Sequence, residues 1–435
     1  MGSQNKKSVF YTVSTNISRV VLALVLVFSG FVKAVDPKGT MYKLQEYAET
    51  FSIDAFSNDW LLFFAIVLAA AEFLIGVFLL MGVYRKPVAT IVLLVFVLFT
   101  PFTLYMAVAS PMADCGCFGD AFEVPNWLSF LKNLFLFVLA FVVFLGRRRF
   151  VCYISAKNRW MVSLFAIAYV AFIEGIALSF VPVLDFRNYA VGNNLRELVQ
   201  GKNDAYRSVL VYEKDGVQHE FAQDSLPDET WSFVDARSEL VTEGSAPVIG
   251  DFSILDWNDD YDIAENVLAD TGFVCIVVSE MLEEASFGRV DKINDLYDYS
   301  LEHGISFFAV TSSNEDNISL WRKRTGAEYP IYWADNMMLR AITRANPGLM
   351  ILKDGVVVGK WNVENMPAEE RMMSLEAVEG RARAEVFGVP GLHFWLFVLI
   401  APLVFISFLD LLTGRKKKES QTTTPEKIED ISNNI

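Results

Sequence analysis

The chain contains 435 residues, of which 53% are hydrophobic, and its formal net charge is −15. This length exceeds that of an ordinary single domain and indicates two or three units. The negative charge argues against a nucleic-acid partner, because proteins that bind nucleic acids carry basic surfaces that neutralise phosphates. The four cysteines and three histidines are too scattered to supply a set of metal ligands, so no metal site is predicted.

Six apolar runs are long enough to cross a bilayer, which requires about 20 residues of helix. The first run has no small-residue cleavage site and is long, so it is predicted to be an anchor that stays on the protein. The six predicted spans cover residues 17–35, 60–81, 88–109, 127–145, 160–181 and 392–412.

Basic residues predict the orientation of these spans, because Lys and Arg concentrate in cytoplasmic segments. If the spans alternate in direction, four basic clusters fall on one face. We therefore expect a multi-pass protein of the bacterial inner membrane, with both termini in the cytoplasm and residues 186–390 in the periplasm. The clusters are Lys6, Lys7 and Arg19, then Arg85 and Lys86, then Arg147, Arg148, Arg149, Lys157 and Arg159, and finally Arg415, Lys416, Lys417 and Lys418.

A cysteine pair lies between the third and fourth spans, in the segment Asp114-Cys115-Gly116-Cys117-Phe118-Gly119-Asp120. In this topology Cys115 and Cys117 face the periplasm, where disulfides form and persist. In an extended chain their Cα atoms would lie about 6.5 Å apart, near the upper limit for a disulfide, and Gly116 lets the backbone bend. A disulfide in so small a ring would be strained and easily reduced. Cys115 and Cys117 are therefore candidate catalytic thiols.

The neighbours of this pair favour the opposite interpretation. Asp114 and Asp120 flank the two cysteines, and no Lys, Arg or His lies within the loop. Carboxylates nearby are expected to raise the pKa of both thiols and to reduce their reactivity. The alternative is a structural clip or a tight turn, and the sequence leaves both interpretations open.

Three ionisable residues lie within the spans, where charge is costly. Glu72 is near the middle of the second span and is expected to face the bundle interior, protonated or partnered. Lys33 is near the outer end of the first span and could extend towards the membrane surface. If Lys33 instead approached Cys115 or Cys117, it would offset the charge of the aspartates. Glu72 and Lys33 are both candidate contacts for a quinone or a transferred proton, although Glu72 could equally form a helix–helix hydrogen bond. Glu174 in the fifth span raises the same question.

Short apolar runs and helical segments alternate between residues 187 and 383, which predicts an α/β sheet. Strands are expected at 208–212, 272–278, 305–311, 349–352 and 356–361, and helices at 291–303, 318–324 and 338–345. The last two strands flank Lys353-Asp354-Gly355, a hairpin-turn signal, so the sheet is expected to end in antiparallel strands. Residues 208–241 form an additional β-rich segment.

Over residues 246–361 this order resembles the membrane-tethered, peroxiredoxin-like branch of the thioredoxin fold. Ala246-Pro-Val-Ile-Gly-Asp-Phe-Ser-Ile254 is similar to the entry segment of that branch, and Pro347 falls at its cis-proline position, which implies a partner contact. Thioredoxins place Cys-x-x-Cys after the first core strand, whereas Ser279-Glu-Met-Leu-Glu-Glu-Ala285 contains no cysteine. Cys275 lies within the preceding strand and is expected to be buried and inert. The resemblance implies a binding module that has kept the fold and lost the thiol chemistry.

The first four spans resemble the DoxX/MauE family of redox-associated membrane proteins. Ser29-Gly-Phe-Val-Lys-Ala34, Glu72 and the Asp-Cys-Gly-Cys-Phe-Gly loop carry the resemblance. It implies a role in the maturation of disulfide-containing proteins outside the cytoplasm, beside a thioredoxin-like partner. The whole arrangement resembles fused forms found in Bacteroidota.

The predicted organisation is a four-helix membrane domain at 1–150, a fifth span at 151–185, the periplasmic domain at 186–390, a sixth span at 391–414 and a basic tail at 415–435. The main hypothesis is thiol–disulfide exchange through Cys115 and Cys117 with a periplasmic client or redox protein, with a quinone as electron acceptor. A non-enzymatic envelope scaffold is the alternative. A small-molecule carrier centred on Glu72 and Glu174 ranks last, because no broken helices or inverted repeats occur.

Overall fold

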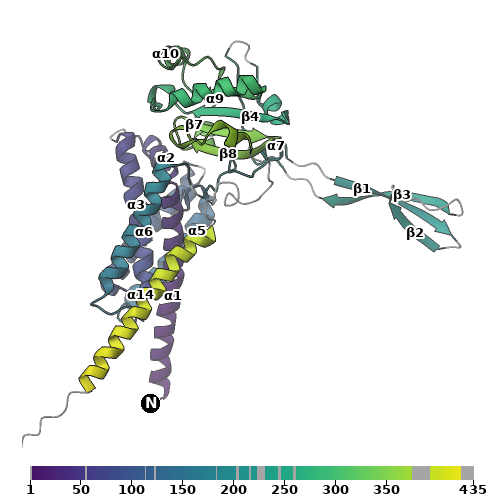
Figure 1. Cartoon of the computed structure of the whole chain (residues 1–435). Helices are drawn as coiled ribbons and strands as arrows, with labels where there is room; N and C mark the ends of the chain where they lie inside the picture. Colours follow the sequence, from purple (N-terminus) through teal and green to yellow (C-terminus); the bar gives the residue numbers. More distant parts are fainter. Residues whose placement is uncertain are drawn as a thin grey trace, which may run out of the picture. The chain divides into compact units, whose positions relative to one another are not determined.

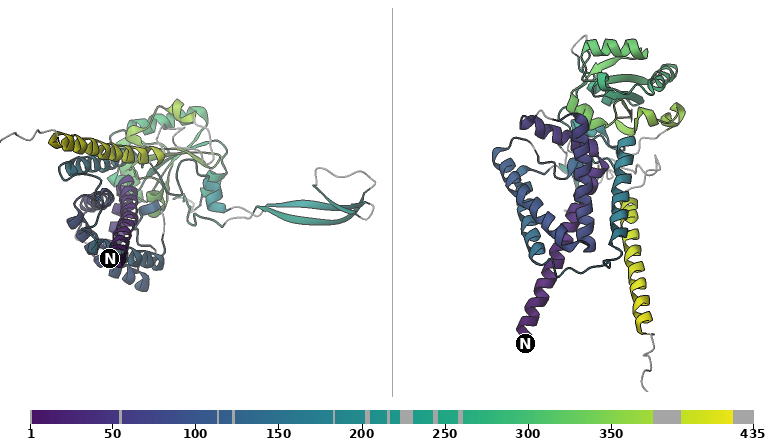
Figure 2. Two further views of the ribbon diagram at one scale, coloured as in Figure 1. Left: turned by 90° about the horizontal axis from the view of Figure 1, so that it is seen from below. Right: turned by 90° about the vertical axis from the view of Figure 1, so that its left-hand side faces the viewer.

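The structure is a computed structural model that describes residues 2–53, 56–112, 114–121, 124–182, 184–201, 205–214, 217–222, 231–242, 246–257, 261–374 and 392–422. The chain forms two compact units, drawn in Figures 1 and 2. The first consists of residues 1–186 and 387–435, and the second of residues 187–386.

The first unit contains six helices that are long and apolar enough to cross a membrane, which confirms the six predicted spans. Figure 2 shows the first helix (purple) and the last helix (yellow) extending beyond the others at one end. The basic cluster of residues 415–418 lies on the last helix, but its side chains fall outside the described residues. The helices are α1 (Gly2–Val35), α3 (Asn58–Met81), α4 (Arg85–Ala109), α5 (Asn126–Leu145), α6 (Arg159–Ser179) and α14 (Leu392–Thr422).

The two helices that pack most closely are α1 and α3, and glycine permits this approach. A methyl group at Gly30 would overlap the backbone nitrogen of Phe73 and lie 2.7 Å from its Cα. A methyl group at Gly76 would lie 2.6 Å from the backbone nitrogen of Val27. Small residues allow such contact between membrane helices, for which lipid provides no hydrophobic driving force.

A short helix, α2 (Pro37–Thr50), follows α1 and was not predicted from the sequence. Asp36 caps its N-terminus by accepting a 2.9 Å hydrogen bond from the Gly39 amide, and Pro37 occupies the first helical position. This combination is a standard start signal for a helix. Apolar runs do not reveal α2, because this helix mixes polar and apolar residues.

Arg19 was assigned to the first basic cluster, but the structure buries it, with 1% of its surface exposed. Its guanidinium donates a 2.6 Å hydrogen bond to the Val151 carbonyl and stacks against the rings of Phe150 and Tyr153. Arg19 therefore ties α1 to the segment between α5 and α6, and it is not a solvated charge.

The second unit contains a five-stranded sheet in the order β6-β5-β4-β7-β8. The central strand β4 (Phe273–Ser279) is parallel to β5 (Ser306–Thr311) and antiparallel to β7 (Gly348–Lys353). Beyond them, β6 (Ile331–Trp333) is parallel to β5, and β8 (Val356–Asn362) is antiparallel to β7. The predicted α/β sheet with an antiparallel end is therefore confirmed.

Side chains of β4 alternate between two hydrophobic cores, as expected for a strand covered on both faces. Val274, Ile276 and Val278 lie in one core, whereas Cys275 and Val277 lie in the other. Figure 1 shows α9 along one face of the sheet. The first core includes residues of α7 (Leu195–Gln200), α8 (Ala264–Ala269) and α11 (Asn336–Ile342), and the second includes residues of α9 (Val290–His303) and α10 (Glu315–Thr325).

The additional β-rich segment forms its own three-stranded antiparallel sheet in the order β2-β1-β3. These strands are β1 (Ala205–Lys214), β2 (Val217–Ala222) and β3 (Ser232–Thr242). Four short helices complete the described chain: η1 (Gly119–Ala121), η2 (Leu282–Glu284), η3 (Val363–Asn365) and α12 (Glu369–Met373).

Replacing Gly30 or Gly76 by alanine tests the close packing of α1 and α3. Alanine improves helix propensity by about 1 kcal/mol, so any loss of stability must come from the clash. We expect each change to lower the free energy of unfolding by about 1–3 kcal/mol, the usual cost of overpacking. Thermal unfolding in detergent would measure this loss. Gly175→Ala in α6 is the matched control, because an added methyl group there meets no atom within 4 Å.

Candidate functional site

The cysteine pair lies in the connection between α4 and α5, where two glycines bend the backbone. Gly116 and Gly119 adopt φ angles of +58° and +54°, which favour glycine. The Gly116 amide donates a 2.8 Å hydrogen bond to the Asp114 carboxylate. A side chain at Gly116 would also collide with Lys43, whose Cγ would lie 2.6 Å from an added Cβ. The sequence expectation that Gly116 bends the chain between the cysteines is thus met.

Both cysteines are free thiols, and their environments differ. Cys115 is buried, and its Sγ donates a 3.2 Å hydrogen bond to Ser129 Oγ. A hydrogen bond between the two thiols favours Cys115 as the anion, so it lowers the pKa of Cys115 and raises the pKa of Cys117. Burial opposes the first effect and adds to the second. Cys115 is therefore the thiol that ionises first.

A buried lysine holds the carbonyl of Cys117. Lys33 Nζ forms a 2.7 Å ion pair with Glu72 Oε2 and donates hydrogen bonds to Ser29 Oγ (2.8 Å) and the Cys117 carbonyl (2.7 Å). The Ser29 hydroxyl donates a second hydrogen bond, also 2.7 Å long, to that carbonyl. Three acceptors thus match the three N–H groups of the ammonium.

This arrangement shows where the Lys33 side chain lies and which residue is the partner of Glu72. Lys33 does not extend towards the membrane surface, because its side chain is only 9% exposed and points to Glu72. Glu72 is partnered, as expected for a carboxylate within a span. The energetic reason is the same for both groups, because a charge away from water is strongly destabilising unless a counterion is paired with it.

Helix α2 covers the other side of the loop. Lys43 Nζ forms ion pairs with Asp114 (2.6 Å) and Glu46 (2.8 Å). Burial disfavours the charge on Lys43, but hydrogen bonds to these two carboxylates outweigh it and raise the pKa of the lysine. The Tyr47 hydroxyl donates a 2.8 Å hydrogen bond to the Cys115 carbonyl. These contacts attach the loop to α2 as well as to α1.

The expectation that flanking carboxylates would suppress thiol ionisation is wrong for Asp114, because Lys43 neutralises it. A second cation, Lys132 of α5, was missed. Its Nζ lies 4.1 Å from the centre of the Phe118 ring and favours the anionic forms of both cysteines. The side chain of Asp120 falls outside the described residues.

The structure therefore brings together four of the predicted site residues, Cys115, Cys117, Lys33 and Glu72. It adds three residues that sequence reasoning did not identify, Tyr47, Ser129 and Lys132, and it places Ser29 and Lys43 against the same loop. The sequence does contain a signal for Lys132, because an ionisable residue near the start of a span is expected to have a functional role or a specific partner, as was expected for Glu72. Ser129 has no comparable signal, because serine is common in membrane helices.

Pro347 belongs to the second unit and follows a cis peptide bond, at the position predicted from the sequence. Asn346 beside it accepts a 2.6 Å hydrogen bond from the Ser279 hydroxyl and donates one of 2.9 Å to the Met281 carbonyl. The segment that replaces the expected Cys-x-x-Cys therefore packs against the proline turn. Cys275 is fully buried, and burial raises its pKa to about 12, so it is inert as predicted.

Two glutamates of that segment, Glu283 and Glu284, are exposed, whereas Glu280 is half-buried. Glu280 forms a 2.6 Å ion pair with Arg340, and Glu283 accepts a 2.6 Å hydrogen bond from the Ser313 hydroxyl.

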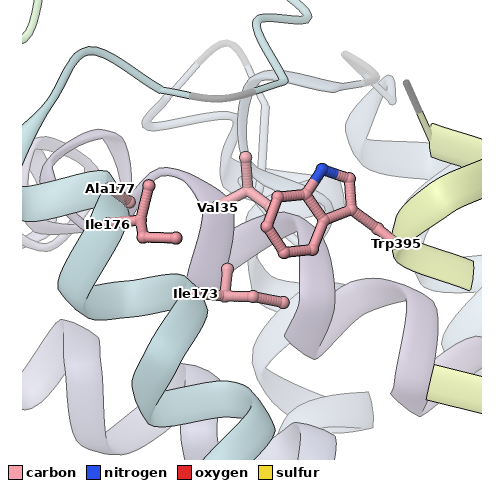
Figure 3. A pocket seen from close by; sticks show the side chains of 5 residues that line it. All are labelled: Val35, Ile173, Ile176, Ala177 and Trp395. Carbon is pink, nitrogen blue, oxygen red and sulfur yellow. The ribbon is translucent and has the colours of Figure 1, made fainter. Parts of the chain in front are cut away.

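A small apolar pocket lies elsewhere in the first unit, between the end of α1, α6 and α14. Figure 3 shows the Trp395 indole ring near Val35 and Ile173, and Ile176 and Ala177 complete the lining. The pocket carries no charged side chain. Among the described residues, no group of three or more His, Cys, Asp or Glu side chains could hold a metal ion.

The residues of this site lie within a part of the chain that matches a known protein family. Residues 11–146 match the family model of methylamine utilisation protein MauE. This part of the chain belongs to the MauE family. The match confirms the resemblance of the first four spans, and it includes every cysteine-loop contact described above. Residues 206–243 match a domain of unknown function (DUF8463), which corresponds to the three-stranded sheet. No curated protein and no solved structure matches the chain.

The ion pair of the MauE region can be tested by removing one charge and then both. Lys33→Met should lower the free energy of unfolding by about 3 kcal/mol or more, because it leaves Glu72 buried without a counterion. The double variant Lys33→Met with Glu72→Gln should recover much of that loss. Thermal unfolding of the purified protein in detergent would measure both. Equal losses for the single and double variants would contradict the assignment.

Proposed function

We propose that this chain is a membrane thiol–disulfide exchange protein whose reactive groups are Cys115 and Cys117. The observation that carries the proposal is the environment of the Cys115 sulfur, which lies 3.2 Å from the Ser129 hydroxyl oxygen in a hydrogen bond, while the neighbouring Cys117 thiol favours ionisation of Cys115. Lys43 and Lys132 add to this support, because the first neutralises Asp114 and the second favours both thiolates. A structural turn would need no such arrangement of charge around its sulfur atoms.

The exchange requires only a client that carries a disulfide or a dithiol. In the reducing direction, one thiolate attacks a client sulfur, the client S–S bond breaks, and a mixed disulfide forms while one client thiolate leaves. The second cysteine of the pair then attacks its neighbour in the mixed disulfide and releases the other client thiolate. Two electrons pass from the pair to the client, and the two thiol protons end on the client. The reverse sequence oxidises a client dithiol and reduces a Cys115–Cys117 disulfide.

A quinone was predicted as electron acceptor, with Lys33 and Glu72 as its contacts. All three N–H groups of Lys33 already have acceptors, so a quinone carbonyl would have to displace Glu72, Ser29 or the Cys117 carbonyl. We assign the Lys33–Glu72 pair to holding the loop. We route no step through a quinone, which stays a prediction.

The second unit is proposed to be a thioredoxin-like module that docks the client. The strand order around β4 supports this interpretation. Because the segment from Ser279 to Ala285 has no thiol, the module would bind a partner and leave electron transfer to the cysteine loop.

The orientation follows from the basic clusters: bacterial inner membrane, both termini in the cytoplasm, and the cysteine loop and second unit in the periplasm. A membrane-impermeant maleimide added to intact spheroplasts tests this topology. Cys152 should stay unlabelled until the membrane is opened, because it is exposed on the cytoplasmic side. A cysteine introduced by Met337→Cys should be labelled in intact spheroplasts, because Met337 is 77% exposed in the second unit, which is proposed to lie in the periplasm. Labelling of Cys152 in intact cells would contradict the topology.

Thiol trapping in membranes tests the redox proposal directly. After acid quenching and alkylation, Cys115 and Cys117 should appear partly as thiols and partly as a disulfide, and the ratio should change with the redox potential of an added glutathione buffer. A Cys115→Ser variant should abolish oxidation or reduction of client proteins, while Cys152→Ser should leave it unchanged. A pair that never changes state would support a structural clip.

A non-enzymatic scaffold is the second candidate function, and the missing thiol in the second unit favours it. In that case the Cys115→Ser variant would remain functional, whereas an Arg340→Met change, which removes the partner of Glu280 beside the proline turn, would weaken partner capture. Loss of function upon cysteine replacement alone would exclude the scaffold.

A further inference from the structure

The two thiols of the pair meet different surroundings, and the difference lies in α5. Ser129 is fully buried, accepts the hydrogen bond from Cys115 Sγ and donates one of 3.2 Å to the Val124 carbonyl. Lys132 follows three residues later, and residues three apart lie on the same helix face. One face of α5 therefore presents a hydroxyl group and an ammonium group to the cysteine loop.

The described cations of the neighbouring helices already have partners. From α2, Lys43 is paired with Asp114 and Glu46, and the Tyr47 hydroxyl is bound to the Cys115 carbonyl. Lys43 is therefore shared between two carboxylates and is not available to balance a thiolate.

From α1 and α3, Lys33 and Glu72 neutralise each other, and Lys33 binds the backbone of Cys117. Lys132 differs, because within the described part of the chain no carboxylate is paired with it. Its ammonium lies over the Phe118 ring and is the cation left to balance a thiolate.

We propose that Ser129 and Lys132 form a thiolate-holding site for Cys115, in which the serine supplies a hydrogen bond and the lysine supplies the balancing charge. When Cys115 loses its proton, the Ser129 hydroxyl hydrogen can rotate from the Val124 carbonyl to the sulfur, so that the serine changes from acceptor to donor. Both are positioning residues, since neither touches the client. The inference deepens the proposed thiol exchange and rests on it.

The site also assigns different roles to the two sulfur atoms. When the reduced pair is ionised, Cys115 carries the negative charge, and a stabilised thiolate is a good leaving group. When a client thiolate attacks the oxidised pair, attack at Cys117 releases Cys115 as that thiolate. Cys117 is therefore the sulfur that forms the mixed disulfide when the pair oxidises a client.

The test is the pH dependence of alkylation at Cys115 in the full-length, reduced protein. In a Cys117→Ser, Cys152→Ser background, Cys115 is the reactive thiol, because Cys275 is buried. Ser129→Ala should move the midpoint of iodoacetamide alkylation upward by about one pH unit, a tenfold loss of rate below the midpoint. Lys132→Met should move it in the same direction, and Ser129→Thr and Lys132→Arg should restore it.

The limiting alkylation rate at high pH separates this effect from misfolding or altered access, which would change the limit and not the midpoint. Ser407→Ala is the matched control, because it removes a half-buried serine hydroxyl of α14 that bonds to its own helix. An unchanged midpoint in Ser129→Ala with a preserved limit would overturn the inference. That failure is distinguishable from failure of the proposed function, since a pair that never cycles in cells still titrates in this assay.

The sulfur assignment has its own readout in a mixed disulfide formed on the oxidised, unsubstituted pair. A monothiol peptide that attacks the Cys115–Cys117 disulfide should be found attached to Cys117 after acid quenching and mass spectrometry, with Cys115 released as the thiol. Equal adducts at both cysteines, or adducts at Cys115 only, would overturn the assignment.

Discussion

The buried ion pair between Lys33 and Glu72 is the constraint on which the membrane site depends. Each charge would be costly alone within a span, so each fixes the other, and together they hold α1 against α3. Because the same ammonium also binds the Cys117 carbonyl, the cysteine loop is anchored to the most closely packed part of the bundle. Gly30 and Gly76 make this possible by allowing the two helices to approach.

Around that ion pair, two helices determine the electrostatic environment of the thiols. Helix α2 removes the effect of Asp114 through Lys43, and α5 contributes Ser129 and Lys132. The result is an asymmetric pair, in which one cysteine is favoured as an anion and the other is not. The second unit contributes no reactive thiol, since Cys275 is buried in the sheet. The proposed exchange therefore depends on the two cysteines of the MauE region.

Much of the architecture could be predicted because it depends on patterns along the chain. Six spans, the sheet with its antiparallel end and the buried Cys275 all follow from hydrophobic runs and turn residues. The helix 338–345 was predicted too long, and it ends at Ile342 because the residues before Pro347 cannot continue a helix easily. The candidate site was harder to predict than the fold. Lys43, Ser129 and Lys132 contact the loop from helices whose arrangement is not specified by any local sequence pattern. The sequence left the position of Lys33 open for the same reason, since snorkelling or pairing depends on which residue faces it.

The central claim is that Cys115 and Cys117 form a redox-active pair, and a redox titration in membranes tests it most directly. With the thiol state read by alkylation and mass spectrometry across glutathione buffers, the account predicts one two-electron transition with a midpoint above about −250 mV, in the range of exchange catalysts. A pair that stays fully oxidised below about −300 mV would be a structural disulfide and would contradict the account. A pair that stays reduced at every potential would contradict it equally.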